Sequence, residues 1–167
     1  HTSKLATSSD IAALQTFGFR GEALASLCAL STVNITTCLA GDVPKGTKLT
    51  FESSGKLKDT AVVAAQRGTT VAIDKVFHNL PVRRRELERN IKREWHKVIA
   101  LLNQYACVLT GVKFSVSQQP TKGKRILLFS TKGNQTTRDN IINIFGAKTM
   151  AALVSLDLKL EIVPTTT

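Results

Sequence analysis

The sequence predicts an α+β fold, because strand-like and helical patterns occupy separate stretches of the chain. Residues 32–76 alternate apolar and polar side chains, which is typical of strands with one buried face. Residues 91–109 instead place apolar side chains at steps of three and four, which indicates an amphipathic helix. With 167 residues, 43% of them hydrophobic, the chain can bury a core and has the size of one ordinary domain or two small pieces.

The first half of the chain is expected to form a helix followed by a sheet. A short helical stretch near Asp10–Leu14 comes first. Residues 22–30 are rich in Ala and Leu and apolar nearly all round, so they predict a buried helix. An antiparallel meander of about four strands is expected next. Its strands are Val33–Thr37, Lys48–Glu52, Val62–Ala65 and Thr69–Ile73.

The second half is expected to contain a long helix, a hairpin and a last strand. Asn79 can cap a helix and Pro81 suits its first turn, and the helical period then continues to a stop at Gly111. Trp95 and Tyr105 fall at core positions of this helix. The further elements are a hairpin of residues 113–117 and 125–131, a helix over 137–145, a helical turn over 148–154 and a strand over 156–162.

The chain is strongly basic, since 23 Lys and Arg residues face 12 Asp and Glu residues, for a net charge of +11. This charge favours polyanions, such as nucleic acid, nucleotide phosphates or an anionic membrane surface, or it serves solubility alone. The three cysteines and three histidines have neither disulfide-framework nor metal-ligand spacing, which predicts a reducing compartment and no metal site. No apolar run reaches the roughly 18 residues of a membrane span.

A glycine-bounded turn runs directly into the first predicted helix. The turn is Gly18-Phe19-Arg20-Gly21, and the helix begins at Glu22-Ala23-Leu24. The first turn of a helix has unpaired N–H groups and the positive end of the helix dipole, and a glycine lets a ligand approach the backbone closely. The segment is therefore a candidate phosphate site. A helix start that binds nothing has the same local pattern.

The heptapeptide from Gly18 to Leu24 resembles the signature of the MutL family of DNA mismatch-repair proteins. Three further segments agree with this family in order and spacing. Thr2-Ser3-Lys4 resembles the segment that closes the nucleotide lid, Gly68-Thr69-Thr70-Val71 the later nucleotide-contact strand, and residues 77–83 the junction between two modules. The resemblance covers essentially the whole chain and looks closest to the eukaryotic post-meiotic-segregation type.

The resemblance implies a fold and a cellular role. Residues 1–80 would be the later half of a GHKL-type ATPase sandwich, and residues 81–167 the start of a ribosomal-protein-like β-α-β transducer domain. The implied activity is that of an ATP-driven clamp that couples mismatch recognition to downstream excision in the nucleus, with ATP and Mg²⁺ as cofactors. The implied partners are mismatch-containing double-stranded DNA, a second MutL homologue in a heterodimer and a MutS-type mismatch-recognition complex, with no membrane.

The resemblance also implies which residues contact the nucleotide. They are Thr2, Ser3, Lys4, Gly18, Phe19, Arg20, Gly21, Glu22, Ala23, Leu24 and Thr69. Glu22 is not expected to be the catalytic base. In the family, three features lie upstream of the position that corresponds to His1. They are the glutamate that acts as catalytic base, the asparagine that holds Mg²⁺ and an Asp-x-Gly-x-Gly loop. No catalytic or metal-binding residue is therefore expected within the chain, and the isolated 167-residue chain is predicted not to hydrolyse ATP.

Two groups of basic residues are candidates for DNA binding. They are Arg83, Arg84, Arg85, Arg89 and Arg93 at the start of the long helix, and Lys122, Lys124 and Arg125 in the hairpin. Such cations can track the phosphates of DNA. The interspersed glutamates leave a second interpretation open, a solvated helix face with i,i+4 ion pairs. A non-catalytic nucleic-acid-binding module and a heterodimer-interaction module are thus the alternatives to an ATPase fragment.

Overall fold

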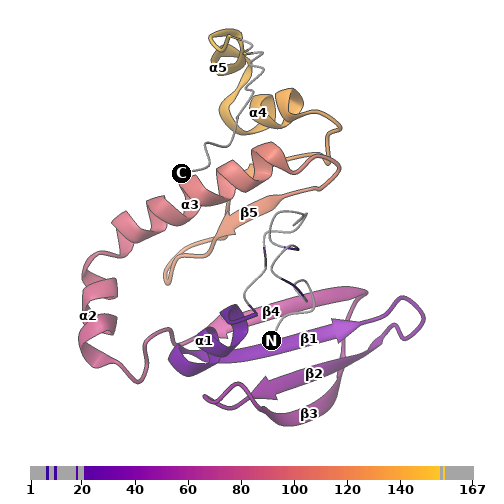
Figure 1. The fold of residues 1–167 in the computed structure, drawn as a ribbon, viewed down its shortest axis with the longest axis vertical. Helices are drawn as coiled ribbons and strands as arrows, with labels where there is room; N and C mark the ends of the chain where they lie inside the picture. The colour runs from indigo at the N-terminus through magenta and orange to yellow at the C-terminus, as the bar shows by residue number, and fades with distance from the viewer. Residues whose placement is uncertain (1–6, 8–9, 11–17, 19–20, 155, 157–167) are drawn as a thin grey trace, which may run out of the picture. The chain divides into compact units, whose positions relative to one another are not determined.

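The computed structural model describes residues 7, 10, 18, 21–154 and 156. The chain divides into two compact units, the first ending at Asn90 and the second beginning at Ile91. The first unit contains helix α1, strands β1 to β4 and helix α2, and the second contains α3, β5, β6, α4 and α5 (Figure 1). This mixture of helices and antiparallel strands confirms the predicted α+β class.

Four antiparallel strands form the sheet of the first unit. They are β1 (Thr32–Cys38), β2 (Lys45–Phe51), β3 (Leu57–Ala64) and β4 (Gly68–Asp74). Their order across the sheet is β3-β2-β1-β4, so β4 pairs with β1 and not with β3. All four strands were expected, but the expectation of a simple meander is wrong, because this order is that of a Greek key.

The strand order follows from where the apolar side chains lie. Val33 pairs with Ile73 and Ile35 with Val71 between β1 and β4, while Leu49 of β2 pairs with Ile35 on the other side. Paired residues direct their side chains to the same face of a sheet, so these five side chains share one face. With β4 beside β1, the sheet therefore gains a continuous apolar row on one side.

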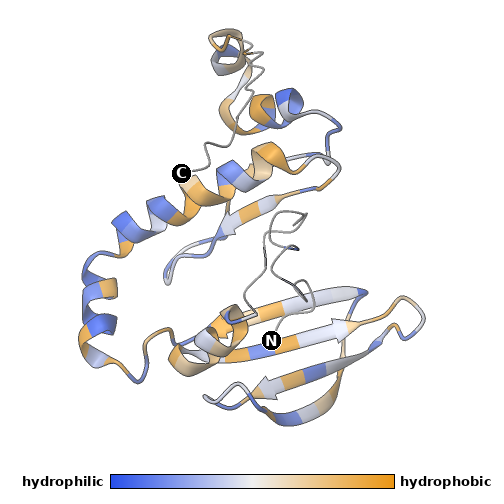
Figure 2. Ribbon diagram, in the orientation of Figure 1, coloured by the Kyte–Doolittle hydropathy of each residue, from blue (hydrophilic) through white to orange (hydrophobic). Residues whose placement is uncertain are grey.

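Helix α1 (Ala23–Leu30) lies against this apolar face (Figure 1). Cys28 of the helix and Val33 of β1 are buried, at 4% and 1% exposure. Figure 2 shows α1 as a largely apolar helix, yet Leu24 is 51% exposed. The expectation of a buried helix is therefore wrong for the described residues: the sheet covers one side of α1, and the rest of its apolar surface is open.

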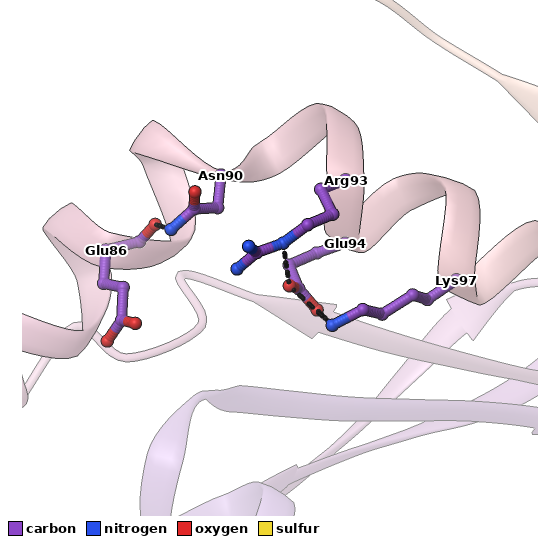
Figure 3. A network of polar contacts seen from close by, with 5 residues as sticks. All are labelled: Glu86, Asn90, Arg93, Glu94 and Lys97. Atoms are coloured by element: carbon purple, nitrogen blue, oxygen red, sulfur yellow. Dashed lines mark hydrogen bonds and ion pairs between the residues drawn. The ribbon is translucent and has the colours of Figure 1, made fainter.

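The predicted long helix is broken into two helices at Asn90. Helix α2 spans Pro81–Arg89 and helix α3 spans Ile91–Val108. The N–H of Asn90 donates to the carbonyls of Glu86 and Leu87, and its Nδ2 donates to the Glu86 carbonyl at 3.1 Å (Figure 3). An asparagine side chain that competes for backbone carbonyls ends a helix, although the apolar spacing continues across it.

The start of α2 also differs from the expectation. Leu80 occupies the N-cap position, and Pro81 takes the first helical position as predicted. Asn79 caps nothing in α2, because its Nδ2 donates to the carbonyl of Ala29 at 2.8 Å. The N–H of Phe77 donates to the carbonyl of Leu30 at 2.7 Å. Both bonds satisfy carbonyls at the end of α1, which have no partner within that helix.

In the second unit, α3 packs with a hairpin and with helix α4. The hairpin strands are β5 (Ser115–Gln118) and β6 (Ile126–Ser130), and the helices are α4 (Thr137–Phe145) and α5 (Ala147–Ala151). The hairpin and α4 confirm the predictions, and α5 is shorter than the stretch predicted for it. Apart from Asp10 and Leu156, the helix expected near residues 10–14 and the strand expected over 156–162 lie outside the described residues.

A buried asparagine joins α4 to the end of α3. Asn140 has no exposed surface, and its Nδ2 donates to the carbonyls of Cys107 and Leu109 at 3.2 and 3.3 Å. Its Oδ1 accepts a hydrogen bond from Nδ2 of Asn134 at 3.0 Å. The last carbonyls of a helix lack partners inside it, so Asn140 supplies bonds that the end of α3 needs.

Replacing Asn140 with alanine is expected to lower the free energy of unfolding by about 2–3 kcal/mol, because two part-buried carbonyls and the Asn134 amide lose a partner. Urea unfolding followed by circular dichroism measures this change. The control is Gln135→Ala, which removes an exposed amide in the same segment and should change the stability by less than about 0.5 kcal/mol. An N140A variant as stable as the parent would contradict this role.

Candidate nucleotide and nucleic-acid sites

Among the described residues, no side chain caps the first amides of α1 after the glycine turn. Gly21 has φ 73°, in the left-handed region that glycine adopts without steric cost. Glu22 occupies the N-cap position, but its side chain makes no capping hydrogen bond. The N–H of Ser26 donates to the Glu22 carbonyl at 2.9 Å. The preceding amides, of Ala23 and Leu24 among others, have no acceptor inside the helix.

This arrangement is suited to an anion. The uncapped amides lie at the positive end of the helix dipole, and the first turn of α1 carries no acidic side chain. Residues 21–24 are exposed, as is Gly18, so a ligand can reach the backbone. The other predicted nucleotide contacts in these segments, Phe19, Arg20, Thr2, Ser3 and Lys4, lie outside the described residues.

Thr69, the remaining predicted nucleotide contact, lies at the beginning of β4. It pairs with Thr37 of β1, and the two Oγ1 atoms are 3.0 Å apart. A hollow of about 400 Å³ beside it is lined mainly by residues 64–70. None of residues 21–24 lines this hollow, so the described residues do not bring Thr69 and the glycine turn into one cavity.

The basic residues of α2 fall into two kinds. Arg84 forms an i,i+4 ion pair, with its Nε 2.9 Å from Oε1 of Glu88. Arg83, Arg85 and Arg89 are exposed and have no carboxylate at ion-pair distance among the described residues. Arg84 therefore fits the interpretation of a solvated helix face with i,i+4 ion pairs. The positive charges of Arg83, Arg85 and Arg89 remain available to an external anion.

Arg93 stands on a different helix from the other basic residues of its group, because the chain breaks at Asn90. Its Nε is 3.3 Å from Oε1 of Glu94, and Nζ of Lys97 is 2.9 Å from the same oxygen (Figure 3). The hydrogen bond from Lys97, assisted by Arg93, holds the pKa of Glu94 below its usual range. The positive charge of Arg93 is thus partly neutralised by the carboxylate of Glu94.

The hairpin carries the second basic group. Lys122 and Lys124 are exposed, and neither has an ion-pair partner in the part of the chain that the structure describes. Arg125 donates from Nε to Oγ of Ser117 at 2.7 Å, which fixes its side chain across the hairpin. The structure therefore brings these three cations together around one turn.

A hollow of about 510 Å³ in the second unit has no counterpart in the sequence predictions. Residues of α3, the hairpin and α4 line it, among them Trp95, Asn103 and Phe129. Trp95 and Phe129 are partly buried, so each has the character of an ordinary core residue, and Asn103 has that of an ordinary helix residue. No local pattern in the sequence distinguishes these residues as a site.

The described residues were also compared with the requirements of a metal site and of a membrane span. Within residues 7, 10, 18, 21–154 and 156, no three His, Cys, Asp or Glu side chains form a group that could hold a metal ion. No helix of this part of the chain is long and apolar enough to cross a membrane. Its three cysteines are free thiols, and burial raises the pKa of Cys107.

Comparison with curated proteins relates the chain to DNA mismatch repair. It is 45% identical over 153 residues to the DNA mismatch repair protein pms1 of Schizosaccharomyces pombe, a match that covers 92% of this chain and 19% of that protein. Further mismatch-repair proteins from animals, a plant, budding yeast and a slime mould match at 39–43% identity. The chain spans between 15% and 19% of the length of these relatives. A scan of protein-family models finds no match.

Two solved structures resemble the chain. The N-terminal domain of a DNA repair protein aligns with a TM-score of 0.77 and 39% identity, over 87% of this chain and 43% of that one. The MutL ATPase domain of Aquifex aeolicus, solved with ADP, aligns with a TM-score of 0.57 and 22% identity, over 83% of this chain and 52% of that one. The second likeness supports a GHKL-type fold.

The carboxyl pKa of Glu94 is expected to rise in Lys97→Met, because this change removes the strongest partner of the carboxylate. NMR titration of the Glu94 side chain measures the midpoint. Since pairing lowers the pKa in the folded state, its contribution to stability is present above the pKa of an unfolded glutamate, about 4.3, and is lost as the pH falls through the lower folded value.

The matched control for this titration is Lys92→Met, which removes the same charge from the same helix. Lys92 has no ion-pair partner among the described residues, so the Glu94 midpoint should stay where it is in the parent. Equal midpoints in the parent and in K97M would show that the Lys97 contact does not hold in solution.

Proposed function

Since the chain belongs to the MutL family of DNA mismatch-repair proteins, we propose that it supplies phosphate contacts and a DNA-facing surface to an ATP-dependent clamp of mismatch repair. The observation that carries this proposal is the uncapped start of α1 at Gly21. It lies within the heptapeptide that resembles the family signature. ADP in the related Aquifex aeolicus domain makes a nucleotide the proposed ligand.

The proposed phosphate contacts are the backbone amides of residues 21–24. Each bond between an N–H group and a charged phosphate oxygen contributes about 1.5–3 kcal/mol, and a short turn can supply several such bonds. Phe19 and Arg20, with Thr2, Ser3 and Lys4 of the lid, are proposed to complete these contacts. Thr69 is proposed to contact the nucleotide near its adenine, through the hydroxyl that it now holds beside Thr37.

Magnesium would accompany the nucleotide and neutralise part of its charge. The resemblance implies that an asparagine upstream of residues 1–167 holds this ion. The residues of this chain are therefore proposed to hold the phosphates and to leave the metal and the catalytic base to other segments of the protein.

Two modules would transmit nucleotide binding. Residues 1–80 are proposed to belong to the ATPase domain and residues 81–167 to the transducer, and the division into two compact units at Asn90 supports an organisation of this kind. Closure of the lid on ATP would dimerise the protein with a second MutL homologue around mismatch-containing DNA, in the nucleus. A MutS-type complex would load this clamp, which would then direct excision.

A non-catalytic nucleic-acid-binding module is the second candidate function. It is favoured by the cations that lack ion-pair partners among the described residues, which are Arg83, Arg85, Arg89, Lys122 and Lys124. Such charges suit a surface that tracks phosphates without reading bases. The clamp would use the same surface, so the two candidates differ in whether the nucleotide turn is also occupied.

Gly21→Val is expected to weaken ATP binding at least about tenfold, because a β-branched residue at φ 73° is strained and displaces the amides that follow. Amide NMR shifts on titration with Mg·ATP should centre on residues 21–25 in the parent chain and disappear in the variant. The control is Gly41→Val, where an added Cβ meets nothing within 4 Å. Shifts confined to other residues of the parent would overturn the phosphate assignment.

Changing Arg83, Arg85 and Arg89 to glutamine is expected to weaken binding to duplex DNA and to reduce its salt dependence. The slope of log affinity against log salt should shrink by up to about 0.9 for each phosphate contact that is lost. Fluorescence anisotropy at several salt concentrations measures it.

The control for the DNA measurement replaces Lys45 and Lys58 of the sheet and Lys56 just before β3, which are also exposed and carry the same total charge. This variant should keep most of the parent slope. Equal losses in the two triple variants would mean that net charge alone drives the binding, and α2 would then have no specific role.

A further inference from the structure

Helix α3 carries an apolar stripe that the described residues leave largely uncovered. Four of its aliphatic side chains are between 45% and 58% exposed, and they are Ile91, Val98, Leu101 and Val108. Trp95, Ile99 and Ala106 lie on another side of the same helix and are buried or partly buried. On that side, Trp95 and Ile99 line the hollow that α3 shares with the hairpin and α4. The exposed stripe is therefore a separate surface of the second unit.

The exposed side chains follow a heptad spacing. From Ile91, successive steps of three, four, three, four and three residues lead through Glu94, Val98, Leu101 and Tyr105 to Val108. These six positions, named the α3 seam here, fall within about 100° of the helix circumference. Apolar residues at such a and d positions form the surface through which a second helix packs in a coiled coil. The α3 seam is therefore suited to another helix.

We propose that a second copy of the chain covers the α3 seam, with the two α3 helices antiparallel about a twofold axis. The order of the steps along the seam reads the same from both ends, so a reversed copy places a side chain opposite each of the six positions. Ile91 then faces Val108 of the second copy, Val98 faces Leu101 and Glu94 faces Tyr105. A contact of this kind closes after two copies and leaves neither seam exposed.

The charges of α3 favour antiparallel order over parallel order. The Lys, Arg and Glu side chains of the helix all lie within residues 91–97, and residues 98–108 include none of them. Figure 2 shows this change from mainly hydrophilic to mainly hydrophobic residues along α3. Antiparallel order sets the negative end of one helix dipole beside Lys92 and Arg93 of the other copy. Parallel order would instead bring the cationic ends of the two helices together.

Glu94 is the charged member of the α3 seam, and its contacts make it compatible with packing. Its carboxylate accepts hydrogen bonds from Nζ of Lys97 at 2.9 Å and from Nε of Arg93 at 3.3 Å (Figure 3). Both cations stand on one flank of the seam, so the carboxylate is directed toward that flank and stays paired. A charge that is paired does not carry the cost of an isolated buried charge. The stem of Glu94 remains to pack against Tyr105 of the second copy.

Sedimentation equilibrium of the 167-residue chain, without nucleotide or DNA, tests this proposal. A monomer–dimer equilibrium with a Kd in the micromolar range is expected, and the dimer should become tighter as the salt concentration rises. Salt screens the repulsion between two chains of net charge +11, while the apolar contacts of the α3 seam persist. A dimer that becomes weaker in salt would be held by ion pairs and would overturn the proposal.

A pair of matched variants assigns the dimer to the α3 seam. Leu101→Asp should raise the dimer Kd at least about tenfold, because it places an unpaired charge in each half of the contact. The control is Ala100→Asp, which adds the same charge at the exposed neighbouring position outside the seam. It should change the Kd by less than about threefold. Far-UV circular dichroism and thermal unfolding show whether each variant is folded.

Disulfide cross-linking tests the antiparallel order. A mixture of Ile91→Cys and Val108→Cys chains should form a covalent dimer, because these positions face each other. Ile91→Cys alone should not, because the two copies of residue 91 lie about 26 Å apart at opposite ends of the pair. A disulfide requires Cα atoms within about 7 Å. The parent chain, with Cys28, Cys38 and Cys107, is the control for its own thiols.

This proposal is independent of the proposed function, because the α3 seam lies in the second unit and Gly21 in the first. Gly21→Val should therefore dimerise as the parent does. The proposal is overturned if the parent stays monomeric up to millimolar concentration, if Leu101→Asp dimerises as the parent does, or if Ile91→Cys alone cross-links as well as the mixture. A monomeric parent together with a dimeric chain that ends at Val154 would also overturn it and assign the seam to residues 155–167.

Discussion

The pairing of β4 with β1 is the constraint on which the candidate nucleotide site depends. It places Ile73 and Val71 beside Val33 and Ile35, and so creates the apolar face against which α1 lies. Because the chain passes directly from α1 into β1, the position of α1 on this face fixes where its first turn lies. The apolar pairs in the sheet thus position the amides at Gly21, to which the side chain of Glu22 contributes no capping hydrogen bond.

Asparagine side chains set the ends of several helices. Asn79 donates to the Ala29 carbonyl near the end of α1, Asn90 separates α2 from α3, and Asn140 of α4 donates to two carbonyls at the end of α3. Each donates from Nδ2 to at least one backbone carbonyl near the end of a helix. The apolar periodicity determines where helices can form, and these polar contacts determine where they stop.

This division explains which parts of the fold could be predicted from the sequence. The helix Thr137–Phe145 and the four strands of the sheet have strong local patterns, and the predictions for them are confirmed, except that β3 begins at Leu57 and not at Val62. The break at Asn90 was missed, because Ile91 continues the apolar spacing while a single side chain interrupts the backbone. The position of β4 beside β1 was not predicted either. Alternation of apolar and polar residues shows which side chains of a strand share a face, but it does not show which strand lies next to it.

The candidate sites divide in a similar way. The turn at Gly18–Leu24 has a local pattern that predicts its chemistry, and the structure adds the uncapped amides of α1. The hollow around Trp95 and Asn103 has no such pattern, because α3, the hairpin and α4 contribute its lining from three separate stretches of the chain. Sites of that kind depend on tertiary packing, which spacing along a single segment does not encode.

The position of β4 in the strand order also bears on the colloidal behaviour of the chain. Within the described residues, β4 pairs only with β1, so its other side is an open edge. Its middle residues, Thr69 to Ile73, carry no charge, and Val71 and Ile73 are 47% and 41% exposed. Uncharged open edges promote association between chains, and charged side chains oppose it. Mutual repulsion at a net charge of +11 therefore keeps the chains apart in dilute salt, and buffers of high ionic strength weaken that protection.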